Sequence, residues 1–108
     1  MITKDFAIKS VLEERARQDL KWGQQSHSEE WWLAILMEEV GELSQAILET
    51  HFDNGTDLGG FENIRKEAVQ VAAVAVAMLE CIDRKPLNSI RYTPKQAVHP
   101  DGSISGTK

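Results

Sequence analysis

The feature that most constrains this chain is the run from Ala68 to Leu79, in which Gln70 is the only polar residue. A helix that is apolar on every side has to be buried on every side. So short a chain achieves this best when a subunit interface covers the helix. We therefore expect an all-α fold, an antiparallel helical bundle completed by dimerisation or tetramerisation. Its small side chains would allow close helix approach: Ala72, Ala73, Ala75 and Ala77.

A first helix is expected over about residues 3–21. It is followed by Trp22 and Gly23, and glycine suits the left-handed conformation in which many helices end. The helix has an apolar and a more polar set of positions, which predicts that the apolar set packs inward. The apolar set is Phe6, Ile8, Val11, Leu12 and Ala16, and the polar set is Arg15, Arg17 and Asp19.

A second helix is expected over about residues 29–51, with Ser28 as its N-cap and two glutamates in its first turn. Its apolar residues recur at steps of three and four, which indicates a packed amphipathic helix. These residues are Trp32, Leu36, Val40, Leu43 and Ile47. The apolar run described above belongs to a third helix, over about residues 61–84.

The remaining segments are expected to be connections. Residues 53–60 read Asp-Asn-Gly-Thr-Asp-Leu-Gly-Gly, but Ile64 stands where a calcium loop needs its last acid, so we interpret the segment as a turn between antiparallel helices. Residues 1–85 form the predicted helical domain. Residues 86–108 contain prolines and glycines with little apolar periodicity, which predicts an extended or partly disordered tail.

Composition narrows the classes of partner. The 108 residues carry a formal charge of -5, which disfavours a nucleic-acid backbone as partner. A phosphate substrate that binds through a metal ion is compatible with this negative charge, because the cation reverses the local charge. The single cysteine, Cys81, lies in an apolar stretch and is expected to be a buried structural thiol. No uncharged stretch approaches the length of a membrane span, and we expect a cytoplasmic protein with no membrane partner.

The candidate chemistry lies in carboxylates at helical spacing. Glu39 and Glu42 are three residues apart in one predicted helix, and Glu67 and Gln70 are three apart in the next. Residues at this spacing lie about 60° apart around a helix axis, so each pair projects toward one side. Oxygen ligands of this kind suit Mg²⁺, and Glu38 adds a further acid. The alternative interpretation is a solvated acidic face that binds no metal.

Three other side chains have two interpretations each. Gln70 either faces the glutamates or bonds to nearby backbone or to its symmetry mate. His27 is either a cap, surface or core residue, or part of a site. Trp22 lies in a connection near the acidic helix, where it could stack on a base.

Together these residues resemble the MazG-like branch of the all-α nucleoside triphosphate pyrophosphohydrolases. That family has E-x-x-E on one helix and E-x-x-D on the next, preceded by a loop that contains tryptophan. This chain has Trp-Gly-Gln-Gln-Ser-His at 22–27, Glu-Glu-Val-Gly-Glu-Leu at 38–43 and Glu-Ala-Val-Gln at 67–70. The resemblance covers about residues 10–85. Gln70 stands where the family usually has aspartate.

The resemblance implies metal-assisted hydrolysis of a nucleoside triphosphate to the monophosphate and pyrophosphate, with Mg²⁺ or its substitute Mn²⁺, in a self-associating protein. Because Gln70 replaces an acid, the alternative is a catalytically weakened module for nucleotide binding or helical oligomerisation. The implied metal ligands are Glu39, Glu42, Glu67 and Gln70, and the catalytic acids are Glu38, Glu39, Glu42 and Glu67. The residues expected to bind substrate are Lys21, Trp22, Gln25, His27 and Gln70.

Overall fold

The computed structural model describes residues 2–52 and 60–86, which form three α-helices. They are α1 (Thr3–Trp22), α2 (Glu29–Phe52) and α3 (Gly60–Asp83). The predicted all-helical fold is thus confirmed, with bounds within one residue of those expected. The predicted turn lies outside the described residues except for Gly60, and so does the tail beyond Pro86. None of the described helices combines the length and hydropathy that a membrane span requires.

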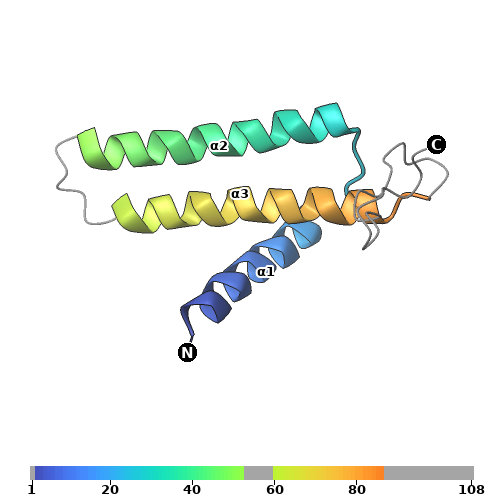
Figure 1. Ribbon diagram of the computed structural model, residues 1–108, viewed down its shortest axis with the longest axis horizontal. Helices are drawn as coiled ribbons and strands as arrows, with labels where there is room; N and C mark the ends of the chain where they lie inside the picture. The colour runs from blue at the N-terminus through green and yellow to red at the C-terminus, as the bar shows by residue number, and fades with distance from the viewer. Residues whose placement is uncertain (1, 53–59, 87–108) are drawn as a thin grey trace, which may run out of the picture.

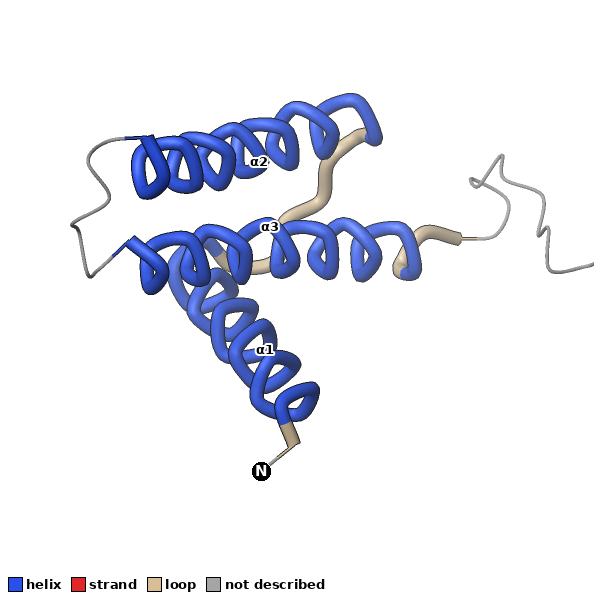
Figure 2. The backbone as a smooth tube through the Cα atoms, turned by 60° about the vertical axis from the view of Figure 1, so that its left-hand side comes forward, coloured by secondary structure: helices blue, strands red, loops and turns tan. Residues whose placement is uncertain are grey.

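Helix α3 is the central element. Helices α2 and α3 run antiparallel side by side, whereas α1 crosses α3 obliquely (Figures 1 and 2). Both α1 and α2 pack against α3, and no packing between α1 and α2 is found within the described residues. The apolar run of α3 is therefore covered from two directions within one chain. Ala73 is fully buried and Val74 is 7% exposed, although Leu79 remains 58% exposed.

Local sequence explains where the helices begin and end. Gly23 has a φ of 74°, and its N–H donates to the Asp19 carbonyl, 2.8 Å away, which ends α1 as expected. The Ser28 hydroxyl accepts a hydrogen bond of 3.2 Å from the Trp31 N–H, which confirms the predicted cap of α2. A Cβ atom at Gly60 would lie 2.6 Å from the Thr50 side chain. Glycine is therefore required where α3 starts beside the end of α2.

The core lies between the first half of α2 and the second half of α3. Trp32 is 2% exposed and packs with Val74 and Cys81. The Cys81 thiol donates to the His27 carbonyl with an Sγ–O distance of 3.7 Å, which confirms the predicted buried cysteine. The prediction that Ile47 belongs to the packed apolar stripe of α2 is wrong, because Ile47 is exposed and its neighbour Ala46 is buried instead.

Helix α1 differs most from expectation. Arg15, assigned to the polar side, is its one buried residue, at 8% exposed, whereas Ile8 and Leu12 are more than half exposed. The inward side of α1 is mostly polar because Arg15 reaches carboxylates on both α1 and α3. Its partly buried or buried positions are Ser10, Val11, Glu14, Arg15 and Gln18.

Candidate metal centre and adjoining pockets

Three of the predicted acids meet where α2 faces the first half of α3. Glu39, Glu42 and Glu67 each offer a carboxylate oxygen, and these atoms lie within 4.8 Å of one another. Glu39 lies in the partly buried stripe of α2, because its position continues the spacing of Trp32 and Leu36 toward α3. Glu67 is also partly buried, whereas Glu42 is exposed at the edge. We call this group the acidic cluster.

The acidic cluster lacks a compensating cation among the described residues. Glu39, Glu42 and Glu67 take part in none of the ion pairs found there. One buried oxygen of Glu39 and one of Glu67 have no hydrogen-bond partner within residues 2–52 and 60–86. Buried carboxylate oxygens without partners are costly, so this arrangement favours a bound cation.

The electrostatics of Glu39 follow from this crowding. Burial raises the pKa of the Glu39 carboxyl, and the neighbouring charges of Glu42, Glu67, Glu38 and Glu14 raise it further. A cation at the cluster would offset both effects because it stabilises the ionised form.

The three carboxylates fit a small divalent cation. Mg²⁺ binds oxygen ligands at about 2.1 Å, which places opposing ligands about 4.2 Å apart. The three oxygens all lie within 4.8 Å of one another, so side-chain rotations can bring Glu39, Glu42 and Glu67 to one ion. The donor set consists only of oxygen, the ligand type that Mg²⁺ and Mn²⁺ prefer.

A pocket of about 240 Å³ adjoins the acidic cluster through Glu39. We call it the central pocket. It brings together five of the residues predicted for the site, and its floor is the core side chain of Trp32. The five predicted residues that line it are Trp22, Gln25, Glu38, Glu39 and Gln70.

Two predicted residues lie elsewhere. The His27 ring packs edge-on against Trp32, with 4.8 Å between ring centroids, and it lines a different surface pocket beside Cys81. The Lys21 ammonium lies 4.7 Å from the centroid of the Trp22 ring. Lys21 therefore contacts the central pocket only through Trp22. Glu38 lines the central pocket but is not part of the acidic cluster.

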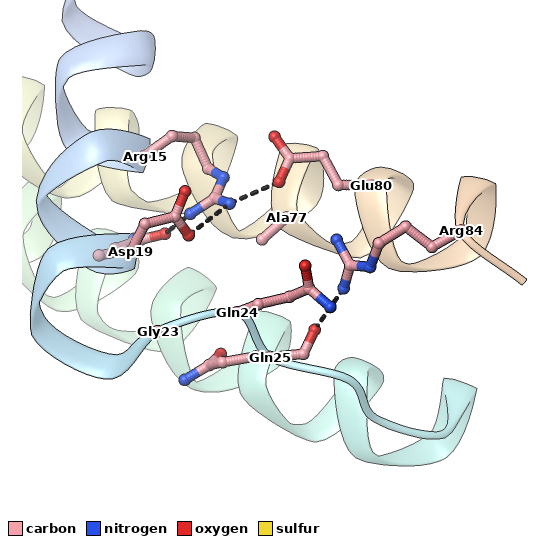
Figure 3. A pocket seen from close by; sticks show the side chains of 9 residues that line it. Arg15, Asp19, Gly23, Gln24, Gln25, Ala77, Glu80 and Arg84 are labelled. Carbon is pink, nitrogen blue, oxygen red and sulfur yellow. Dashed lines mark hydrogen bonds and ion pairs between the residues drawn. The ribbon is translucent and has the colours of Figure 1, made fainter.

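A second, more enclosed pocket was not anticipated from the sequence. It lies between the end of α1, residues 23–25 and the second half of α3 (Figure 3). Arg15, Asp19, Glu80 and Arg84 supply its charges. Glu80 interrupts the apolar end of α3, and that interruption was the one available sequence signal. We call this the polar pocket.

Comparisons with protein-family models, curated proteins and solved structures find no match for this chain.

Proposed function

We propose that this chain is a Mg²⁺-dependent nucleoside triphosphate pyrophosphohydrolase of the MazG-like kind, which releases a nucleoside monophosphate and pyrophosphate. The observation that carries the proposal is the acidic cluster, in which one buried oxygen of Glu39 and one of Glu67 lack partners in the described part of the chain, beside a pocket that Glu39 lines. A nucleotide substrate agrees with our expectation of a cytoplasmic protein that binds neither nucleic acid nor membranes.

Each residue then has a role that its position allows. Glu39, Glu42 and Glu67 hold the cation, and Gln70 offers a neutral amide oxygen from the same pocket as Glu39. A bound Mg²⁺ supplies charge neutralisation for the phosphate oxygens. Glu38 lies in the pocket outside the ligand cluster, where its carboxylate can orient a water and accept its proton. The exposed ring of Trp22 lines the central pocket and offers an apolar surface to the part of the nucleotide that lies there.

The proposal is tested by incubating the purified protein with each common ribo- and deoxynucleoside triphosphate and Mg²⁺, with the products separated by ion-exchange chromatography. We expect a monophosphate and pyrophosphate in equal amounts. A diphosphate and orthophosphate would indicate a different bond cleavage. No product from any nucleotide, with a positive control active in the same buffer, would reject the enzyme assignment.

A second candidate is a catalytically weakened nucleotide-binding module, and Gln70 favours it. This residue lines the central pocket beside Glu39 with an uncharged side chain. Under this alternative the protein binds Mg²⁺ and nucleotide, but turnover is undetectable. Calorimetry with a nonhydrolysable triphosphate analogue measures binding, and the product assay described above measures hydrolysis. Binding of the analogue without any product from the natural triphosphates supports the module.

We further propose that the active form is a homodimer or homotetramer. The support comes from apolar side chains on α1 and α2, at positions that neither helix buries against α3. Ile8, Leu12 and Leu20 are 53%, 58% and 90% exposed on α1, and Leu33, Met37 and Leu48 are 57%, 54% and 52% exposed on α2. Exposed apolar side chains of this kind are available for an interface between copies of the chain. Sedimentation at micromolar concentration tests the proposal, and a monomer throughout would contradict it.

A further inference from the structure

The polar pocket is built around a buried arginine. Arg15 is 8% exposed, and its guanidinium donates to Asp19 Oδ1 at 2.9 Å, to Gln18 Oε1 at 3.1 Å and to Glu80 Oε1 (Figure 3). Its Nε atom is buried without a partner among the described residues. Side chains of two helices, α1 and α3, thus converge on Arg15, which fixes the positions of two carboxylates.

The pocket has the size of a small ring. Its volume is about 110 Å³, on a scale on which one water molecule needs about 10–15 Å³. This space is too large for a single water and suits a planar heterocycle. Figure 3 shows the side chains of Arg15, Asp19, Glu80 and Arg84 around it, with the backbone of Gln25 along one edge.

The polar pocket and the central pocket are neighbours. They share Gln18, Gln25 and Ala77 as lining residues. On α3, Gln70 lines the central pocket but not the polar pocket, whereas Ala77 lines both. These two residues are seven positions apart, which is about 10 Å along a helix. A nucleotide with its phosphates near the acidic cluster can therefore extend along α3 into the polar pocket.

The pocket offers acceptors and donors in a particular combination. Asp19 and Glu80 each use one oxygen for Arg15, and within the described residues the second oxygen of each forms no hydrogen bond. Arg84 donates one hydrogen bond of 2.7 Å to the Gln25 carbonyl, and its other N–H groups can donate to a ligand in the pocket. The side-chain amide of Gln24 adds further donors.

We propose that the polar pocket binds the guanine base of the substrate, with a carboxylate of Asp19 or Glu80 accepting from its N1–H and 2-amino group. This inference rests on the proposed function and names the substrate class of the same site. Guanine presents two adjacent donors beside the acceptors O6 and N7, and Arg84 and Gln24 can donate to those acceptors. Adenine presents a lone pair at N1, which a carboxylate repels.

The proposal is tested by calorimetry with the full chain, Mg²⁺ and three nucleoside monophosphates: GMP, IMP and AMP. Monophosphates cannot be hydrolysed to pyrophosphate, so binding is measured without turnover. We expect GMP to bind at least about tenfold more tightly than AMP, because a hydrogen bond to a charged group contributes about 1.5–3 kcal/mol. IMP, which lacks the 2-amino group, should fall between the two.

Substitutions assign the preference to this pocket. Glu80→Gln and Asp19→Asn are examined separately, so that Arg15 keeps one carboxylate partner in each, and circular dichroism verifies folding. We expect at least one of them to reduce GMP affinity about tenfold while AMP affinity stays within about twofold. Glu62→Gln is the matched control, because Glu62 is an exposed acid that lies on α3 with Glu80 and lines neither pocket. It should change neither the GMP affinity nor the AMP affinity.

The outcomes separate the base assignment from the catalytic assignment. Equal affinities for GMP and AMP, or equal losses for both in the two pocket variants, would overturn the guanine proposal even if triphosphates are hydrolysed. A GMP preference that depends on Glu80 or Asp19, in a protein that hydrolyses no triphosphate, would support the base pocket and reject the enzyme. Absence of binding to all three would overturn the guanine proposal as well.

Discussion

Helix α3 carries two charged clusters on different sides, and their construction differs. The acidic cluster, toward α2, joins Glu39, Glu42 and Glu67, and no cation of the described residues pairs with them. The cluster toward α1 places the guanidinium of Arg15 between two carboxylates, Asp19 and Glu80. The second cluster contains its own counter-ion, whereas the first lacks one.

This difference separates a cluster that needs an external cation from one that does not. Unpaired carboxylates that are partly buried lower stability, so a protein retains them where an external cation compensates. An arginine held by two acids needs no external ion and fastens α1 to α3. We therefore expect changes in the acidic cluster to affect Mg²⁺-dependent activity. Changes in the Arg15 cluster are expected to affect the free energy of unfolding.

The largest expected effect is the loss of hydrolysis when the acidic cluster is neutralised. Glu39→Gln and Glu42→Gln should each lower kcat/KM by at least about a hundredfold, because a catalytic metal contributes several kcal/mol to the transition state. Glu49→Gln is the control, since Glu49 lies on the same helix, is exposed, and among the described residues accepts one hydrogen bond, from Gln45. Wild-type turnover in both cluster variants, with normal folding, would make the metal assignment wrong.

The Arg15 cluster should be tested by unfolding. Arg15→Ala is expected to lower the free energy of unfolding by about 2 kcal/mol, a value reduced for the partial exposure of Asp19 and Glu80. Arg17→Ala is the matched control, because within the described residues the exposed Arg17 forms its ion pair with Glu14 of the same helix and otherwise lies only near the Trp22 ring. It should lower the free energy of unfolding clearly less than Arg15→Ala does in the same urea titration. Equal losses would show that the ion pair between helices adds nothing.

A smaller effect is expected when a fourth acid joins the acidic cluster. Gln70→Asp places a charge beside Glu39, so the Mg²⁺ concentration for half-maximal activity should fall several-fold, since added ligand charge strengthens cation binding. A large gain in hydrolysis would favour the weakened-site alternative. Unchanged or reduced activity would mean that glutamine belongs to the working site. Gln45→Asp, on the exposed side of α2, controls for a nonspecific charge effect.

The smallest expected effect is a change in how the stability of the metal-free protein depends on pH. Because the pKa of Glu39 is raised in the folded state, the native chain binds this proton more readily than the unfolded chain does. Stability therefore falls as pH rises from the ordinary glutamate pKa through the raised one. Glu39→Gln should remove this loss, so it should be more stable than wild type at neutral pH in EDTA.

Thermal unfolding at several pH values, with and without Mg²⁺, measures this effect. The difference between wild type and Glu39→Gln should grow with pH in EDTA and then level off. Added Mg²⁺ should stabilise only the wild type, because a ligand stabilises the state to which it binds. A difference that is constant with pH would contradict the assigned burial and crowding of Glu39.

Much of the candidate site follows from helical periodicity. The spacing of Glu39 and Glu42 places both near the stripe that includes Trp32, and α3, which packs on that stripe, brings Glu67 close to them. Ser28 and Gly23 likewise mark helix ends through chemistry that operates over a few residues. These features depend on local geometry, and a sequence specifies local geometry well.

The polar pocket could not be predicted in this way. Arg15 was assigned to the polar side of α1, yet it is buried, because Glu80 approaches it from 65 residues away in the sequence. Periodicity predicts that the apolar side of a helix packs inward, and α1 does the opposite: Ile8 and Leu12 are exposed. The apolar run of α3 was also expected to need a subunit interface, but α1 and α2 already cover much of it.

The sequence by itself determined three helices, the helix ends at Gly23 and Ser28, and the helical spacing of Glu39 with Glu42 and of Glu67 with Gln70. Only the tertiary structure decided which sides of those helices meet, and with that the acidic cluster, the burial of Arg15 and the two adjoining pockets. The physical reason is that the rise and turn of a helix fix which side chains share a face. The crossing of α1 over α3 instead depends on contacts between residues far apart in the chain.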